Sequence, residues 1–241
     1  MNKYFYDLHL HSCLSPCADD DNTPNNIVGM AALSGINILA LTDHNSTKNC
    51  PAFFEAAKRY GIIPIAGMEL TSSEDIHIVC LFRHLDDAMR FGELIDRRRM
   101  PIKNKPHIFG EQLILDGEDN IIGKEENLLS VATDISIQEI PALVNEYGGI
   151  CYPAHIDREA NGSIAVLGTL PDTPRFNTVE FRFKERIEEY KSLYKLEGKT
   201  IVVDSDAHYL TDIQDAENYF LFEASALDTE GILEELFERL R

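Results

Sequence analysis

The chain has 241 residues, of which 44% are hydrophobic and 26% charged, so it can bury a core and is not an intrinsically disordered protein. Its formal net charge of −19 disfavours binding to a long polyanion such as duplex DNA, because non-specific nucleic-acid affinity comes from Lys and Arg side chains that neutralise phosphates. No apolar run approaches the length of a membrane span, and no secretory or transit signal precedes the first expected strand. We therefore expect a soluble, cytoplasmic protein.

Eight apolar runs have the character of β-strands. Several are apolar on nearly every residue, which is typical of strands buried on both faces of a sheet. In chain order, the runs cover residues 4–11, 36–44, 62–70, 76–82, 149–155, 177–183, 200–208 and 218–223.

Helical patterns separate many of these runs. The first expected helix has Thr23 as its N-cap and Pro24 at its first position, followed by a mainly apolar stretch. Further helices are predicted over residues 47–60, 85–99, 136–147 and 228–240. Alternation of strand and helix indicates a parallel α/β architecture, and the length fits one domain spanning residues 1–241.

One segment interrupts this alternation. From about residue 100 to residue 133 the regular pattern is lost, and residues 112–125 read as two short strands around an acidic turn. We interpret residues 100–133 as an insertion or a lid on the domain.

Polar residues gather towards the C-terminal ends of the apolar runs, where barrel enzymes assemble their active sites. His77 is the exception, because it opens its run and must be placed differently. Ligands from several separate strands favour a barrel over an open sheet, which usually binds at one crevice. The residues at these strand ends are His11, Asp43, His44, Glu69, His155, Asp206 and His208.

The residue types indicate a metal site. His9 and His11 lie one residue apart, so on a strand their side chains would share a face and could hold one ion. Several carboxylates occur beside the histidines in segments rich in Val, Ile and Leu, and charges that close to a core require pairing or a metal. Imidazole and carboxylate ligands together suit Zn, Mn and Fe.

These segments together resemble the polymerase-and-histidinol-phosphatase (PHP) family of metal-dependent phosphoesterases. The resemblance is carried, in chain order, by DLHLHS, LTDHN, the glutamate of GMEL, the histidine of DIHIVCLF, PAH and DSDAH. It covers most of the chain apart from residues 100–133. It implies an α/β fold of the PHP type, a distorted seven-stranded (β/α) TIM-like barrel, with two or three divalent metal ions at its C-terminal face.

The family pattern also implies a ligand set, position by position. The implied ligands are His9, His11, Glu69 and Asp206 for the first ion; Glu69, His77 and His155 for the second; and His44, His208 and Asp19 for the third. The loop after the first strand offers two aspartates for the last of these positions. Relatives often carry a shorter SDG loop after the HxHS motif, so Asp20 is an alternative to Asp19.

The five cysteines form no paired framework, and their odd number indicates reduced thiols without disulfides. Cys13 and Cys17 flank the loop that carries Asp19. We interpret both as small apolar residues rather than as ligands. Replacing both with serine is therefore expected to leave the metal content unchanged.

The leading functional hypothesis is hydrolysis of a small phosphomonoester, such as a nucleotide, by metal-activated water. Asp43 and Arg158 are the candidate catalytic residues: Asp43 would orient a ligand through a hydrogen bond, and Arg158 would bind the substrate phosphate. The alternatives are a nuclease acting on short oligonucleotides and a non-catalytic metal-binding module. Neither a membrane nor duplex DNA is expected as a partner.

Overall fold

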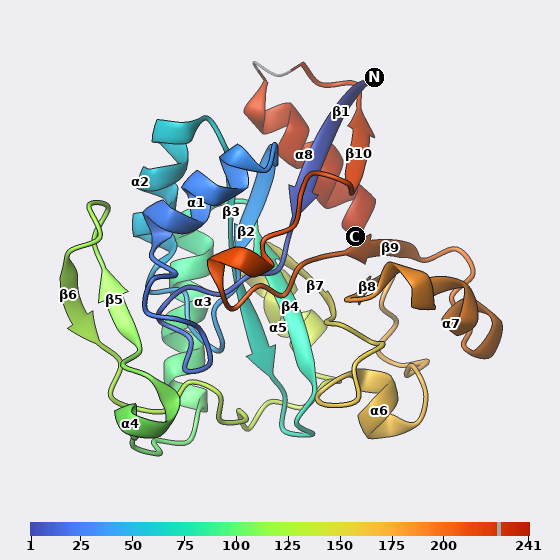
Figure 1. Cartoon of the computed structure of the whole chain (residues 1–241). Coiled ribbons are helices and arrows are strands. Elements are labelled where there is room, and N and C mark those ends of the chain that lie inside the picture. Colours follow the sequence, from blue (N-terminus) through green and yellow to red (C-terminus); the bar gives the residue numbers. More distant parts are fainter. Residues whose placement is uncertain (226–227) are drawn as a thin grey trace.

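The computed structural model describes residues 1–225 and 228–241. All eight predicted strands are present: β1 (Asn2–Asp7), β2 (Ile38–Leu41), β3 (Ile63–Thr71), β4 (His77–Phe82), β7 (Gly149–Pro153), β8 (Thr178–Phe181), β9 (Thr200–Val203) and β10 (Tyr219–Phe222). Six of them form one curled sheet in the order β10-β1-β2-β3-β4-β7, and β8 and β9 form a separate parallel pair (Figure 1). The prediction of an α/β fold is confirmed.

The strand directions differ in part from the predicted parallel architecture. β1, β2 and β3 are parallel, whereas β4 is antiparallel to both β3 and β7, and β10 is antiparallel to β1. The expectation of a parallel sheet is therefore wrong for β4 and β10. The reason at β4 is the connection over residues 72–76, which is too short for the helical crossover that parallel neighbours need.

The reversal of β4 explains the unusual position of His77. In an antiparallel pair, the first residue of one strand lies opposite the last residue of its neighbour. His77 opens β4 and pairs with Thr71, which ends β3. His77, which starts its strand, thus lies at the same end of the sheet as the residues that end the parallel strands.

Contacts beyond the strand ends connect the β8–β9 pair to the larger sheet. The Ile156 amide donates a hydrogen bond to the Glu180 carbonyl at 2.9 Å, just beyond the end of β7. On the other side, Leu10 and Ala207 form an isolated parallel bridge beyond β1 and β9. Within the described residues the strands therefore form a half barrel, and isolated contacts rather than one continuous ladder join β8 and β9 to the larger sheet.

The five predicted helices are also present, with shorter bounds: α1 (Pro24–Leu33), α2 (Cys50–Tyr60), α3 (Leu85–Arg98), α5 (Ile140–Glu146) and α8 (Thr229–Leu240). The Thr23 cap is confirmed, since its hydroxyl accepts a hydrogen bond from the Asn26 amide at 3.3 Å. α5 begins four residues after Ser136, the start of its predicted range, because Ser136 and Glu139 hydrogen-bond each other in a turn before it. Three shorter helices are α4 (Pro106–Phe109), α6 (Ser163–Leu167) and α7 (Ile187–Leu193).

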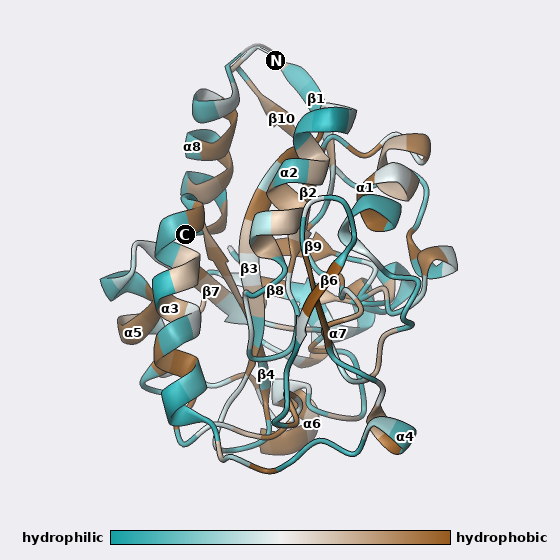
Figure 2. Cartoon of the chain, turned by 90° about the vertical axis from the view of Figure 1, so that its left-hand side faces the viewer, coloured by the Kyte–Doolittle hydropathy of each residue, from teal (hydrophilic) through white to brown (hydrophobic). Residues whose placement is uncertain are grey.

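The core has one layer on each face of the curled sheet. Buried residues of α1, α2, α3 and α5 pack on one face, around side chains such as Phe53 and Phe91. α8 packs on the other face, where Leu236 belongs to the same buried cluster as the alternate residues Ile38 and Ala40 of β2. Figure 2 shows α3 and α8 changing between hydrophilic and hydrophobic along their length, as helices with one buried face do. Among the described helices, none has the length and apolar character to cross a bilayer.

The 100–133 segment contains α4 and an antiparallel hairpin of β5 (Leu113–Leu115) and β6 (Ile121–Lys124). The two short strands predicted over residues 112–125 are therefore present. The hairpin lies outside α1–α3 (Figure 1). It is joined to the loop after β1, because the Leu113 amide donates to the Cys13 carbonyl at 2.9 Å. The buried Arg99 guanidinium donates to the carbonyls of Asn127 and Leu128 and so ties the segment to the end of α3. Its role as an insertion or lid stays a prediction.

Gly67 in β3 is required by close packing. A Cβ at this position would lie 2.9 Å from the Cys80 carbonyl oxygen, a Leu81 methyl and the Thr42 methyl. We expect Gly67→Ala to lower the free energy of unfolding by about 1–3 kcal/mol, measured by urea denaturation, because an overpacked core must shift its backbone.

Gly29 in α1 is the matched control. A Cβ there meets Tyr60 at an ordinary 3.5 Å, and alanine is the better helix former. Gly29→Ala should therefore raise the unfolding free energy by up to about 1 kcal/mol. Equal denaturation midpoints for the two variants would contradict the packing argument.

Candidate metal centre

His9 and His11 lie on the extension of β1 and point to the same side, with their Nε2 atoms 3.2 Å apart. Leu8 and Leu10, which alternate with the two histidines, are buried in the core. The His11 amide donates to the Ala207 carbonyl at 2.9 Å, which holds this extension beside the segment that follows β9. His9 and His11 thus share one face, as predicted, because the backbone that carries them is extended and is hydrogen-bonded to the segment after β9.

Glu69 lies at the centre of the cluster and is fully buried. Five imidazoles surround its carboxylate within 3.4 Å. The nitrogen-to-oxygen distances are 2.8 Å from His77, 2.9 Å from His44, 3.0 Å from His155, and 3.4 Å from both His9 and His11. One carboxylate on β3 therefore gathers histidines from several different segments.

Asp206 and His208 complete the cluster from the end of β9. Asp206 Oδ1 lies 3.3 Å from His11 Nε2 and 3.6 Å from His9 Nε2. His208 keeps its Nε2 available, because its Nδ1 lies 2.8 Å from the Asp206 carbonyl. Asp206 and His155 both have positive φ, 46° and 25°. Such strained backbone at non-glycine residues concentrates at functional sites.

The donor atoms form three overlapping groups that could each hold a metal ion, with the atoms of a group within 4.8 Å of one another. The groups are His9, His11, Glu69 and Asp206; His44, Glu69 and His77; and His11, His44 and His208. His155 lies against Glu69 but outside these groups. The structure thus brings together all the predicted ligands except the loop aspartate.

Orphaned polar atoms show that the cluster fits cations. Glu69 Oε2, Asp206 Oδ1, His155 Nδ1 and His44 Nδ1 are buried without an aligned hydrogen-bond partner. His44 Nδ1 and Glu69 Oε2 are 2.9 Å apart but lack hydrogen-bond alignment. Buried polar groups left in this state are costly unless a ligand satisfies them.

The electrostatics of the cluster favour positive charge. Burial opposes protonation of His9, but the carboxylates of Glu180, Glu69 and Asp206 raise its pKa well above the ordinary value. Burial and the nearby imidazoles of His208 and His44 lower the pKa of His11 well below the ordinary value. The cluster therefore attracts a cation next to His9 but does not accept a proton on every imidazole.

Glu180 on β8 contacts the side of the His9 ring that faces away from the donor groups. The sequence interpretation missed this residue. Its carboxylate oxygens lie 2.9 and 3.0 Å from His9 Nδ1, and Oε1 also accepts a hydrogen bond from the His155 amide at 3.2 Å. The available signal was a charged residue inside the apolar run TVEF. A carboxylate behind a metal-binding histidine fixes its tautomer and ring orientation.

Asp43 is buried and acts on the cluster through serines. It accepts hydrogen bonds of 2.7 Å from Ser12 Oγ and from Ser15 Oγ, and Ser15 Oγ lies 3.0 Å from His11 Nδ1. The predicted catalytic residue Asp43 is thus placed to orient a ligand, and it does not face the donor groups. Arg158 lies at the cluster, with Nη1 2.5 Å from Asp206 Oδ2 and a side chain that is 40% exposed.

The loop after β1 places its aspartates away from the donor groups. Asp19 is exposed, and its Oδ1 accepts a hydrogen bond from the Asp21 amide at 2.9 Å. Asp20 is exposed as well. Cys17 in the same loop is exposed and belongs to none of the three donor groups. Desolvation alone would raise the pKa of its thiol, but the nearby imidazoles of His44 and His208 lower that pKa to about 6.

Comparison with known families agrees with this geometry. The family model of the PHP domain matches residues 7–203. The chain belongs to the PHP domain family. The resemblance inferred from the sequence motifs is therefore confirmed.

Curated relatives of this PHP chain are mostly much longer proteins. An error-prone DNA polymerase from Symbiobacterium thermophilum is 39% identical over 77 residues, which cover 32% of this chain and 7% of the polymerase. A 5′-3′ exoribonuclease from Haemophilus influenzae is 39% identical over 79 residues, 32% of this chain and 28% of that protein. The chain thus matches less than a third of the length of either relative.

Solved structures share the fold. The lesion-specific endonuclease EndoQ from Pyrococcus furiosus has a TM-score of 0.63 and 17% identity, covering 97% of this chain and 55% of that one. A candidate metal-dependent phosphoesterase from Bifidobacterium adolescentis has a TM-score of 0.55 and 18% identity, covering 98% of this chain and 96% of that one. At this identity the likeness concerns the fold alone.

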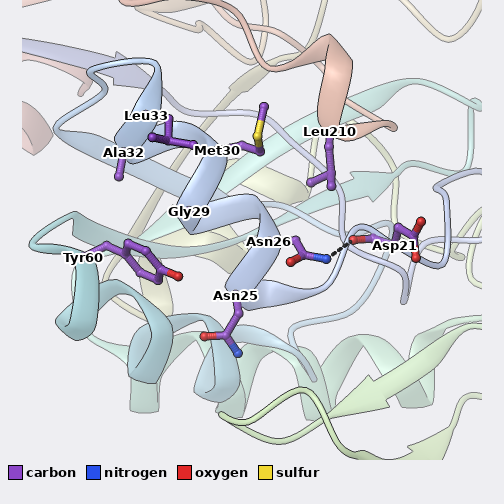
Figure 3. A pocket seen from close by; sticks show the side chains of 9 residues that line it. All are labelled: Asp21, Asn25, Asn26, Gly29, Met30, Ala32, Leu33, Tyr60 and Leu210. Carbon is purple, nitrogen blue, oxygen red and sulfur yellow. Dashed lines mark hydrogen bonds between the residues drawn. The ribbon is translucent and has the colours of Figure 1, made fainter.

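A separate pocket of about 620 Å³ lies over α1 (Figure 3). Met30 and Leu33 of α1, Tyr60 at the end of α2 and Leu210 are among its lining residues. Asp21 also lines it and accepts a hydrogen bond from the Asn26 side chain through its carbonyl. Its lining contains no member of the three donor groups. The chemistry suggested by the histidines is therefore placed elsewhere.

A substitution at Glu180 tests whether its contact with the His9 ring matters for metal binding. We expect Glu180→Gln to weaken Mn²⁺ binding about 10- to 100-fold, measured by calorimetric titration, because a neutral amide fixes the His9 imidazole less strongly. Glu185, in the exposed turn after β8, provides a control that removes the same charge. Unchanged affinity in Glu180→Gln, or an equal loss in Glu185→Gln, would contradict the assignment.

Proposed function

We propose that this PHP protein is a metal-dependent phosphatase that hydrolyses a small phosphomonoester. The observation that supports this most directly is the cluster of histidines and carboxylates around the buried Glu69. Imidazole and carboxylate donors together suit Mn, Fe or Zn. The half-barrel sheet presents these donors at one end of its strands, which supports a hydrolytic site of the PHP type. We propose the seven-stranded barrel of the family as the architecture.

The ligand assignment takes its first ion from a donor group and its second and third ions from the family pattern. His9, His11, Glu69 and Asp206 would hold a first ion. Glu69 would be shared with a second ion, together with His77 and His155. His44 and His208 would hold a third. Divalent ions bound at these residues would activate water and polarise the phosphate oxygens during in-line attack, so that no serine or cysteine nucleophile is needed.

The protein's own residues orient this chemistry. Glu180 holds the His9 ring through Nδ1, and Ser15, itself bonded to Asp43, holds the His11 ring through Nδ1. Both Nε2 atoms are thereby directed to the donor group. Arg158 lies beside Asp206 at the exposed side of the cluster and is proposed to bind a phosphate oxygen pair.

The charge of the chain favours a small substrate. With a net charge of −19, long polyanions are repelled, whereas a small ester needs attraction only at the cluster itself. The second candidate is a nuclease acting on short oligonucleotides. The local identity to an exoribonuclease supports it, because the same metal chemistry serves phosphodiesters.

A substrate panel tests the proposal. The Mn²⁺-reconstituted protein should release phosphate from one or more small esters: a nucleoside monophosphate, a 3′,5′-nucleoside bisphosphate or histidinol phosphate. A 5′-phosphorylated short RNA is the fourth substrate. Shortening of the RNA without action on the small esters would establish the nuclease instead. No product from any of the four would favour a non-catalytic metal-binding module.

His9→Ala and Asp206→Ala are two variants to be tested on the same substrate panel. Each removes a donor from the four-membered group, so we expect phosphate release and bound metal to fall together. Metal content is measured by elemental analysis of the dialysed protein. Retained turnover in either variant would refute the assignment of that residue.

Arg158 should affect substrate binding more than metal binding. We expect Arg158→Gln to raise KM for the phosphomonoester about tenfold or more, the effect of losing a charge-assisted pair of roughly 1.5–3 kcal/mol. Metal content should stay at the wild-type value. Arg90→Gln, at the exposed ion pair with Asp87 on α3, is the control. A normal KM in Arg158→Gln would mean that this side chain only pairs with Asp206.

A further inference from the structure

We propose that Asp157 is a positioning residue that holds Arg158 in place to bind the substrate phosphate. This inference rests on the proposed function, in which Arg158 pairs with phosphate oxygens, and it adds the residue through which the fold orients that side chain. Asp157 is fully buried in the loop after β7 and belongs to none of the three donor groups.

The loop after β7 begins with a four-residue turn that carries two residues of the site. The Arg158 amide donates a hydrogen bond to the His155 carbonyl at 2.9 Å, which closes a turn over residues 155–158. His155 at one end of the turn lies against Glu69, and Arg158 at the other end lies against Asp206. A shift of this short turn would therefore move a residue of the site.

The Asp157 carboxylate joins this turn to the segment after β8. Its Oδ1 accepts a hydrogen bond from the Arg182 amide, and its Oδ2 accepts one from the Phe183 amide, both at 2.9 Å. The Asp157 carbonyl accepts a further hydrogen bond from the Arg186 guanidinium. Two backbone amides thus use both carboxylate oxygens, which requires a side chain with two acceptor atoms.

The His155 end of the turn has anchors of its own. The His155 amide donates to Glu180 Oε1 at 3.2 Å, and the Ile156 amide donates to the Glu180 carbonyl at 2.9 Å. The Arg158 end is joined to the segment after β8 through Asp157. Loss of the Asp157 contacts should therefore displace Arg158 and leave His155 in place.

Phosphate binding to the Mn²⁺-loaded full chain tests this role. Inorganic phosphate is titrated into wild type, Asp157→Asn, Arg158→Gln and the double variant, and its dissociation constant is measured by calorimetry. Asparagine has the shape of aspartate, but its amino group would meet a backbone amide that also donates.

We expect each single change to raise the dissociation constant about tenfold, and the double variant to show no further loss, because Asp157 acts through Arg158. Metal content, measured by elemental analysis, should stay at the wild-type value in all the variants. On any ester that the wild type hydrolyses, Asp157→Asn should raise KM and leave kcat unchanged. Independent losses that multiply to about 100-fold in the double variant would overturn the positioning role.

Asp116→Asn is the matched control. Asp116 Oδ1 accepts hydrogen bonds from the amides of Glu118 and Asn120, both at 2.9 Å, in the turn between β5 and β6. The same substitution there should alter neither phosphate binding nor metal content. An equal loss of phosphate binding in Asp116→Asn would contradict the assignment of Asp157.

A second variant keeps the test available if circular dichroism shows that Asp157→Asn does not fold. Arg186→Gln removes only the contact to the Asp157 carbonyl, and Arg186 is partly exposed. It should weaken phosphate binding in the wild-type background but not in the Arg158→Gln background. Unchanged phosphate binding in Arg186→Gln would then refute the proposal.

Failure of this inference is distinct from failure of the proposed function. Protein that hydrolyses a phosphomonoester but keeps its phosphate affinity in Asp157→Asn would refute the positioning role alone. Protein that binds inorganic phosphate with the expected effects of the variants but acts on no ester would support Asp157 and refute the phosphatase. Wild-type protein that binds no phosphate when loaded with Mn²⁺ would refute both.

Discussion

A buried carboxylate is the constraint on which the site depends. Glu69 is fully buried on β3, and a charge in that position is costly unless partners compensate it. Burial alone would raise its pKa, but the charges of His77, His9 and His44 hold that pKa well below its ordinary range. The imidazoles cannot all be protonated, since burial and the neighbouring rings lower the pKa of His11. Metal ions would satisfy both requirements, because they compensate the carboxylate and use the imidazoles as neutral ligands.

The sheet places the histidines that surround Glu69 at one end of its strands. β1, β2 and β3 are parallel, so the residues that follow them lie at the same end. β4 runs in the opposite direction, and its first residue therefore arrives at that end too. His77 could be recognised in the sequence as a histidine in the wrong place for a parallel strand. The physical reason for its position is the short turn before it, which forces a hairpin.

The sequence predicted those features that depend on local pattern. Apolar runs located the strands, and the Thr23-Pro24 pair located the start of α1. The candidate donor residues were recognisable because polar groups interrupt buried strands at their ends. Strand direction and the Glu180 support were not recognised, since both depend on pairing between distant segments. Glu180 is 171 residues from His9 in the sequence, and only the fold shows that the two side chains touch.

The charge around the site bears on the order in which metal and substrate bind. Beneath His9 lie Glu180, Asp7 and Asp204, all buried. Burial and the charges of Glu180 and Asp7 raise the pKa of Asp204 well above its ordinary value, as expected where carboxylates crowd together. A phosphate ester approaching this cluster in a chain of net charge −19 meets mostly negative potential. Bound divalent ions would reverse that potential locally. On the proposed function, metal loading would therefore precede phosphate binding, and Arg158 beside Asp206 would add a cation from the protein itself.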